Sequence, residues 1–117
     1  MSTRIMGMFA GLLVGLLQGC GPTCQSTCTK LYQPGGECQI ERPGRTTSEL
    51  YDSCMSACDD ALSQPGEVGS YNPYERQNSA TSATSALKND QRAAVWMDCI
   101  AETSCDYLED GYCAPVW

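Results

Sequence analysis

The nine cysteines are the side chains of this 117-residue chain best suited to chemistry. A thiol can bind metal, exchange disulfides, accept lipid or pair with a second thiol. So many cysteines in a short chain are typical of an exported protein stapled by disulfides, since cytosolic thiols are kept reduced. Structural zinc sites and redox enzymes favour Cys-x2-Cys pairs, whereas the nearest pairs here are Cys-x3-Cys. We therefore predict no metal site and no cofactor, and a thiol-redox or metal-binding protein stays an alternative.

Two Cys-x3-Cys pairs, Cys24/Cys28 and Cys54/Cys58, fall in segments that we predict to be helical. Residues four apart lie one above the other on a helix, so two antiparallel helices can be joined by two parallel rungs. Antiparallel order predicts the bridges Cys24–Cys58 and Cys28–Cys54. The spacing is similar to the twin CX3C motif of the small chaperones of the mitochondrial intermembrane space. We interpret that resemblance as the same physical solution, a stapled helical hairpin, and not as kinship.

The four remaining cysteines of this part of the chain, Cys38, Cys99, Cys105 and Cys113, can form two more bridges. Eight cysteines can be paired in many ways, so the spacing alone does not determine the pairing. We expect Cys38–Cys99, which would tie a third helix to the hairpin, and Cys105–Cys113, which would close the tail. The single Phe of the chain is Phe9, ahead of all these cysteines, so the cysteine-bearing part has little apolar material for a core and such bridges would add needed stability.

The N-terminus carries a second cysteine motif. Arg4 precedes an apolar stretch at 5–17, IMGMFAGLLVGLL, which has the length of a signal-peptide core and is shorter than the ~20 residues of a membrane-spanning helix. Leu17-Gln18-Gly19-Cys20 follows and resembles the lipobox of bacterial lipoproteins. Leu17 and Gly19 match that motif, while Gln18 stands where a small residue is preferred. The resemblance implies cleavage before Cys20 and a lipid anchor, with acyl chains such as palmitate, on its thiol.

The odd number of cysteines supports a separate role for Cys20. Assigning Cys20 to lipid leaves eight cysteines, which can form four disulfides. We therefore predict a signal peptide at 1–19 and one cysteine-rich domain at 20–117, held to a membrane through Cys20. In such lipoproteins an Asp directly after the cysteine resembles a signal for retention in the inner membrane. This chain has Gly21 at that position, and the absence of the Asp favours the outer membrane.

Three helices must position these cysteines, and the predicted fold is mainly α: an antiparallel hairpin plus a third helix, with long loops. The hairpin helices are expected at 22–33 and 46–63, the second beginning with a Thr46/Glu49 capping box. The third is expected at 91–108, capped by Asn89 or Asp90.

The polar, small residues of about 66–89 predict a flexible loop, in which Tyr71, Pro73 and Tyr74 could dock locally. Trp117 is expected to pack back on the domain.

Several function classes lack support in this sequence. The chain has no His, which is the commonest general base, and no motif for a serine nucleophile or a phosphate-binding loop. Its formal charge of −7 gives no footprint for nucleic acid. The neighbouring carboxylates Asp59/Asp60 and Glu109/Asp110 fit a solvated surface better than a calcium site.

The sequence therefore predicts a non-enzymatic lipoprotein of the cell envelope. Its domain would be a structural or interaction module for another envelope protein or an envelope polymer, with the membrane as its other partner. A phage-encoded lipoprotein that acts in lysis or superinfection exclusion is the alternative.

Overall fold

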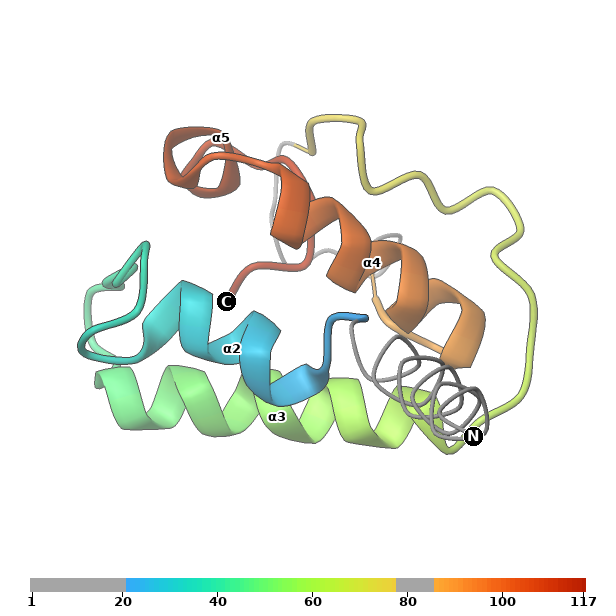
Figure 1. The fold of residues 1–117 in the computed structure, drawn as a ribbon, viewed down its shortest axis with the longest axis horizontal. Coiled ribbons are helices and arrows are strands. Elements are labelled where there is room, and N and C mark those ends of the chain that lie inside the picture. Colours follow the sequence, from blue (N-terminus) through green and yellow to red (C-terminus); the bar gives the residue numbers. More distant parts are fainter. Residues whose placement is uncertain (1–20, 78–85) are drawn as a thin grey trace, which may run out of the picture.

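The structure is a computed structural model that describes residues 21–77 and 86–117. This part of the chain is mainly helical and contains no strand. Its helices are α2 (Cys24–Tyr32), α3 (Thr47–Leu62), α4 (Asp90–Glu102) and the short α5 (Cys105–Glu109). Figure 1 shows α2 lying along α3 as the predicted hairpin, with α4 packed on the hairpin as the third helix. The proposed signal peptide at 1–19 and the proposed lipid-bearing Cys20 lie outside the described residues.

Side-chain caps fix where three of these helices begin. Thr23 caps α2 and Thr46 caps α3, each with the reciprocal capping-box bonds to the residue three positions later. The side chain of Asn89 accepts a hydrogen bond of 2.9 Å from the backbone N–H of Arg92 at the start of α4. The Thr46 capping box and the Asn89 cap are those predicted from the sequence.

The predicted third helix at 91–108 is divided in two. Thr103 has extended backbone, with φ −105° and ψ 140°, so α4 ends at Glu102 and α5 starts again at Cys105. The ammonium of Lys30 on α2 donates to the carbonyls of Ile100 at 2.6 Å and Thr103 at 2.9 Å. Carbonyls at a helix end need donors, and a cation there also complements the helix dipole. Lys30 therefore stabilises the break and ties α2 to α4.

The C-terminal residues cross the core and are held by ring donors. Trp96 donates its indole N–H to the Pro115 carbonyl at 3.0 Å, and Tyr71 donates its hydroxyl to the Ala114 carbonyl at 2.6 Å. Tyr32, which is fully buried, donates to the main-chain oxygen of Trp117 at 2.8 Å. The Trp117 ring packs edge-on against Trp96, with centroids 6.1 Å apart, so it lies on the domain as predicted.

Residues 66–77 follow the surface of the domain without forming a helix. Tyr71 and Pro73 are buried, while Tyr74 remains half exposed. The Pro73 carbonyl accepts a 2.7 Å hydrogen bond from the backbone N–H of Cys113, and the Arg92 guanidinium lies 5.3 Å from the centre of the Tyr71 ring. The predicted flexible loop at 66–89 is thus packed against the tail over its first half, and residues 78–85 lie outside the described part.

Replacing Lys30 tests the contact that ends α4. We expect Lys30→Met to lower the free energy of unfolding by about 1–3 kcal/mol, because buried helix-end carbonyls lose a charged donor. The exposed Lys88 offers the matched control, and Lys88→Met should change stability by no more than about 0.5 kcal/mol. Urea unfolding with the disulfides intact measures both values. Equal effects of the two substitutions would contradict the role given to Lys30.

Stability should also fall at alkaline pH because of two buried tyrosines. Burial raises the pKa of Tyr32 and of Tyr71 well above the ordinary value of 10.0. The unfolded chain therefore releases these protons first as the pH rises, and the stabilisation present below pH 10 is lost above it. We expect a slope of about 1.4 kcal/mol per pH unit for each tyrosine above roughly pH 10.

The Tyr32→Phe/Tyr71→Phe double variant provides the comparison for this slope. It should show the smaller loss of stability between neutral and alkaline pH, even though its stability at neutral pH is lower because two hydrogen bonds are missing. Urea unfolding at a series of pH values measures both proteins. If the free energy of unfolding fell equally with pH in the two proteins, the hydroxyls of Tyr32 and Tyr71 would not be the cause of the alkaline loss of stability.

Candidate functional site

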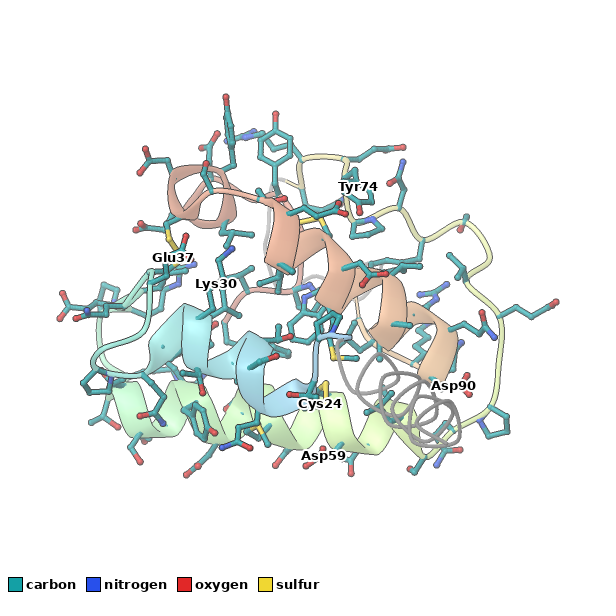
Figure 2. The ribbon with its side chains drawn as sticks, in the orientation of Figure 1. Cys24, Lys30, Glu37, Asp59, Tyr74 and Asp90 are labelled. Atoms are coloured by element: carbon teal, nitrogen blue, oxygen red, sulfur yellow. A yellow bond between two sulfur atoms is a disulfide. The ribbon has the colours of Figure 1, made fainter. Side chains whose placement is uncertain are left out.

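Two parallel disulfide rungs join α2 to α3. The bridges are Cys24–Cys58 and Cys28–Cys54, in the predicted register, with a Cα–Cα distance of 5.8 Å in each. All four half-cystines are buried. The rungs place the start of α2 beside the second half of α3, and Figure 2 shows Cys24 and Asp59 together at that end of the hairpin. The start of α2 is therefore fixed relative to α3.

The other two bridges differ from the prediction. The structure pairs Cys99 with Cys113 and Cys38 with Cys105, so the expected Cys38–Cys99 and Cys105–Cys113 bridges are wrong. The physical reason is the break after α4. Cys99 lies on the inner face of α4, where it meets the buried tail, whereas Cys105 starts α5 on the far side of the break.

A hydrogen bond to the last turn of α2 fixes the position of Cys38. The Cys38 backbone N–H donates to the Lys30 carbonyl at 2.8 Å, so the loop that carries Cys38 folds back along α2. The same Lys30 reaches the end of α4 through its ammonium. One residue of α2 thereby brings the Cys38 loop and the start of α5 to the same place, where the Cys38–Cys105 bridge forms.

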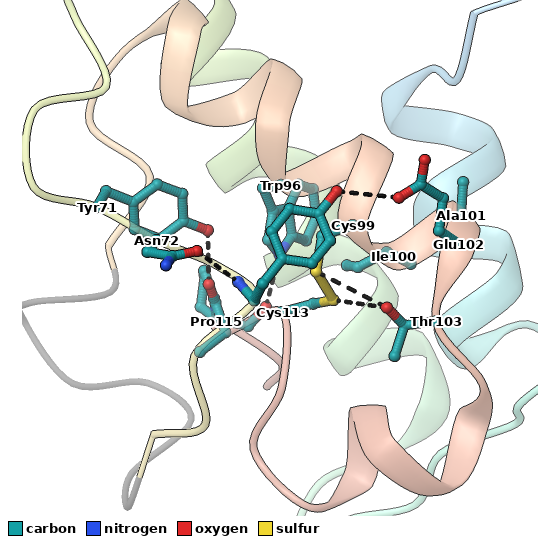
Figure 3. The surroundings of a disulfide bond; sticks show 12 residues. Tyr71, Asn72, Trp96, Cys99, Ile100, Ala101, Glu102, Thr103, Cys113 and Pro115 are labelled. Carbon is teal, nitrogen blue, oxygen red and sulfur yellow. Dashed lines mark hydrogen bonds between the residues drawn. A yellow bond between two sulfur atoms is a disulfide. The ribbon is translucent and has the colours of Figure 1, made fainter.

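Figure 3 shows the Cys99–Cys113 bridge with the hydroxyl of Thr103, at the end of α4, beside it. The Thr103 hydroxyl lies 3.3 Å from Sγ of Cys113 and 3.8 Å from Sγ of Cys99. Because disulfide sulfur carries no hydrogen, the hydroxyl is the donor in both contacts. Cys99 and Cys113 are both buried, whereas Cys38 and Cys105 are only partly covered.

These pairings limit the chemistry available to the described residues. Eight cysteines are paired, so none of them offers a thiolate to a metal ion or to a redox partner. Within 21–77 and 86–117, no three His, Cys, Asp or Glu side chains gather in a way that could hold an ion. The carboxylates Asp59 and Asp60 are exposed, as are Glu109 and Asp110.

A shallow, mostly apolar groove of about 530 Å³ lies where α2 begins. Met55, Asp59 and Leu62 line it from one face of α3, and Met97 lines it from α4. Pro22 and Cys24 form its wall at the start of α2. Leu62 is 45% exposed, which is unusual for a large apolar side chain in this small domain. The groove is thus an apolar surface beside the start of α2.

A second exposed surface carries tyrosines. Tyr107 on α5 is 58% exposed and stacks edge-on with Tyr112 at 5.4 Å, and Tyr74 is 51% exposed. Figures 1 and 2 place α5 and Tyr74 along the edge of the domain opposite α3. The Tyr74 hydroxyl donates to the Glu102 carboxylate at 3.0 Å. We call Tyr74, Tyr107 and Tyr112 the tyrosine surface.

An exposed ion pair borders the tyrosine surface. Arg76 donates two hydrogen bonds of 3.1 and 3.2 Å to the carboxylate of Asp110. These bonds, together with the positive charge, hold the pKa of Asp110 below its ordinary value. The pair joins the 66–77 segment to the turn after α5.

Comparisons with protein-family models, with curated proteins and with solved structures find no match to this chain.

Sequence reasoning missed the role of Lys30 and the lining of the groove. The cysteine spacing predicted the ladder, but nothing in it marked Lys30 as the residue that ends α4. Nothing in the sequence pattern marked Met97 or Leu62 as residues that line the groove. One available signal was the lone Lys30 in the last turn of an otherwise uncharged helix.

Reduction without denaturant should open the Cys38–Cys105 bridge first. This bridge is the most accessible of the four, and attack by an external thiolate needs access to sulfur. Brief treatment with dithiothreitol, alkylation and peptide mass spectrometry should label Cys38 and Cys105 before the other six. Earlier labelling of Cys99 and Cys113, which make the shortest bridged loop, would contradict this order.

Proposed function

We propose that this chain is a non-enzymatic lipoprotein of a bacterial-type cell envelope, anchored by lipid on Cys20. The single observation that carries the proposal is the cysteine pairing. The four bridges use eight of the nine cysteines, and the ninth is the residue that the lipobox-like Leu17-Gln18-Gly19-Cys20 assigns to lipid. An exported protein rarely keeps an odd cysteine without a use for it.

The proposed anchor requires two covalent steps. In the first, the Cys20 sulfur loses its proton and forms a bond to a glyceryl carbon of a glycerophospholipid, whose phosphate headgroup leaves. In the second, water cleaves the amide bond between Gly19 and Cys20. Two or more acyl chains hold a protein stably at a membrane, whereas one chain alone binds only marginally.

The described helices are compatible with such an anchor. None of them is long and apolar enough to cross a bilayer. Only Gly21 and Pro22 separate Cys20 from the Thr23 cap of α2, so the domain would sit close to the membrane surface. The outer membrane is the proposed site because no Asp follows Cys20.

The tyrosine surface is the proposed contact for a partner. Tyrosine is enriched at protein interfaces because its ring supplies apolar area and its hydroxyl supplies hydrogen bonds. Glu102 and Asp110 beside it favour a partner that offers cationic or hydroxyl groups. An envelope protein or a polymer of the envelope fits that description, and the acidic chain offers no patch suited to nucleic acid.

Intact mass of the membrane-purified protein from its own host tests the anchor. We expect a chain that starts at Cys20 and carries added acyl mass. Cys20→Ala should move the domain from the membrane fraction to the soluble fraction, because the acyl chains are lost.

A double variant, Cys38→Ala/Cys105→Ala, serves as the matched control. It removes two cysteines but leaves Cys20, so it should remain with the membrane. A mature protein that retains Met1 and carries no acyl mass would contradict the proposal.

A further inference from the structure

We propose that the apolar groove at the start of α2 receives the lipid carried by Cys20, at the point where its acyl chains leave the protein for the bilayer. This inference rests on the proposed lipidation of Cys20. It adds a binding site for the anchor on the surface of the domain.

Chain length makes the groove accessible to that lipid. Pro22, which lines the groove, is two residues from Cys20. Consecutive Cα atoms are about 3.8 Å apart, so the Cα atoms of Cys20 and Pro22 lie within roughly 7.6 Å whatever path Gly21 takes. A group on the Cys20 sulfur therefore starts beside the groove. The Thr23 capping box starts α2 directly after Pro22, so the groove begins only two residues beyond Cys20.

The lining chemistry suits an acyl chain. Met55 and Leu62 present apolar side chains to the groove, and the buried Met97 also lines it; methionine adapts its shape to irregular apolar ligands. The Met97 sulfur lies 3.8 Å from Sγ of Cys58, so the ladder supports the inner side of the groove. A volume of about 530 Å³ lies within the range typical of sites for small apolar ligands.

Charge argues against a second possible occupant, the headgroups of an anionic bilayer. Asp59 lines the groove and the adjacent Asp60 is exposed, while none of the described Lys or Arg residues lines it. An acidic rim would be repelled by anionic headgroups. A neutral acyl segment meets no such penalty, and the lipid of Cys20 is the acyl group that the chain itself delivers to this place.

Photo-crosslinking from the groove tests the proposal. A diazirine-bearing amino acid replaces Met55 in the full chain, and the lipidated protein is irradiated in vesicles of zwitterionic phospholipid. We expect a crosslink to the acyl chain on Cys20, seen as the peptide of position 55 joined to the lipidated N-terminal peptide. The matched control places the same amino acid at Ser56, the exposed neighbour on α3, where the yield of this product should be several-fold lower.

The inference would be overturned if the diazirine at position 55 reacted mainly with vesicle phospholipid or mainly with water. It would also be overturned if the crosslink to the Cys20 acyl chain formed in equal yield from positions 55 and 56. Acyl mass on Cys20 is measured before irradiation, so a failure of the lipoprotein proposal is recognised separately.

Oxidation of the unmodified chain provides a second readout that needs no substitution in the groove. Hydrogen peroxide should oxidise Met55 several-fold more slowly in the lipidated protein than in the Cys20→Ala protein, under the same conditions, because the acyl chain covers the sulfur. Equal oxidation rates of Met55 in the two proteins would overturn the inference.

Discussion

The register of α2 against α3 is the constraint on which the rest of the domain depends. Two rungs four residues apart prevent the helices from sliding or rotating, because both sulfur pairs would have to break together. With that register fixed, Lys30 on α2 reaches the carbonyls at the end of α4. The position of α4 then sets where Cys99 meets the tail and where Cys105 meets the loop after α2.

A small core explains why the tail is held by hydrogen bonds as well as by packing. Tyr32, Tyr71 and Trp96 each bury a ring and direct a donor at a main-chain oxygen of residues 114–117. An unpaired polar atom in the interior would be costly, so each of these residues stabilises the fold twice, through apolar area and through a satisfied donor. The disulfides add further stability because they lower the conformational entropy of the unfolded chain. The gain from each bridge depends on the length of the loop that it closes.

Local patterns in the sequence predicted the helical hairpin, its two rungs and the caps at Thr46 and Asn89, since each depends on residues a few positions apart. The break in the third helix could not be predicted in that way. No Gly or Pro lies between Gln91 and Glu109, and the donor that stabilises the break comes from Lys30, about seventy residues earlier in the chain. Both errors in disulfide pairing follow from that one long-range contact. The groove was missed for a related reason, because its lining combines α2, α3 and α4.

The Cys38–Cys105 bridge has a mechanical consequence for a protein tethered by one end. It joins the hairpin directly to the last helix, so tension between the start of α2 and the tail would travel through sulfur bonds and bypass α3, α4 and the segment between them. Cleavage of the backbone by a protease between α3 and α4 would leave both fragments covalently attached. The domain could thus be cut within that connection and still remain one covalently joined piece.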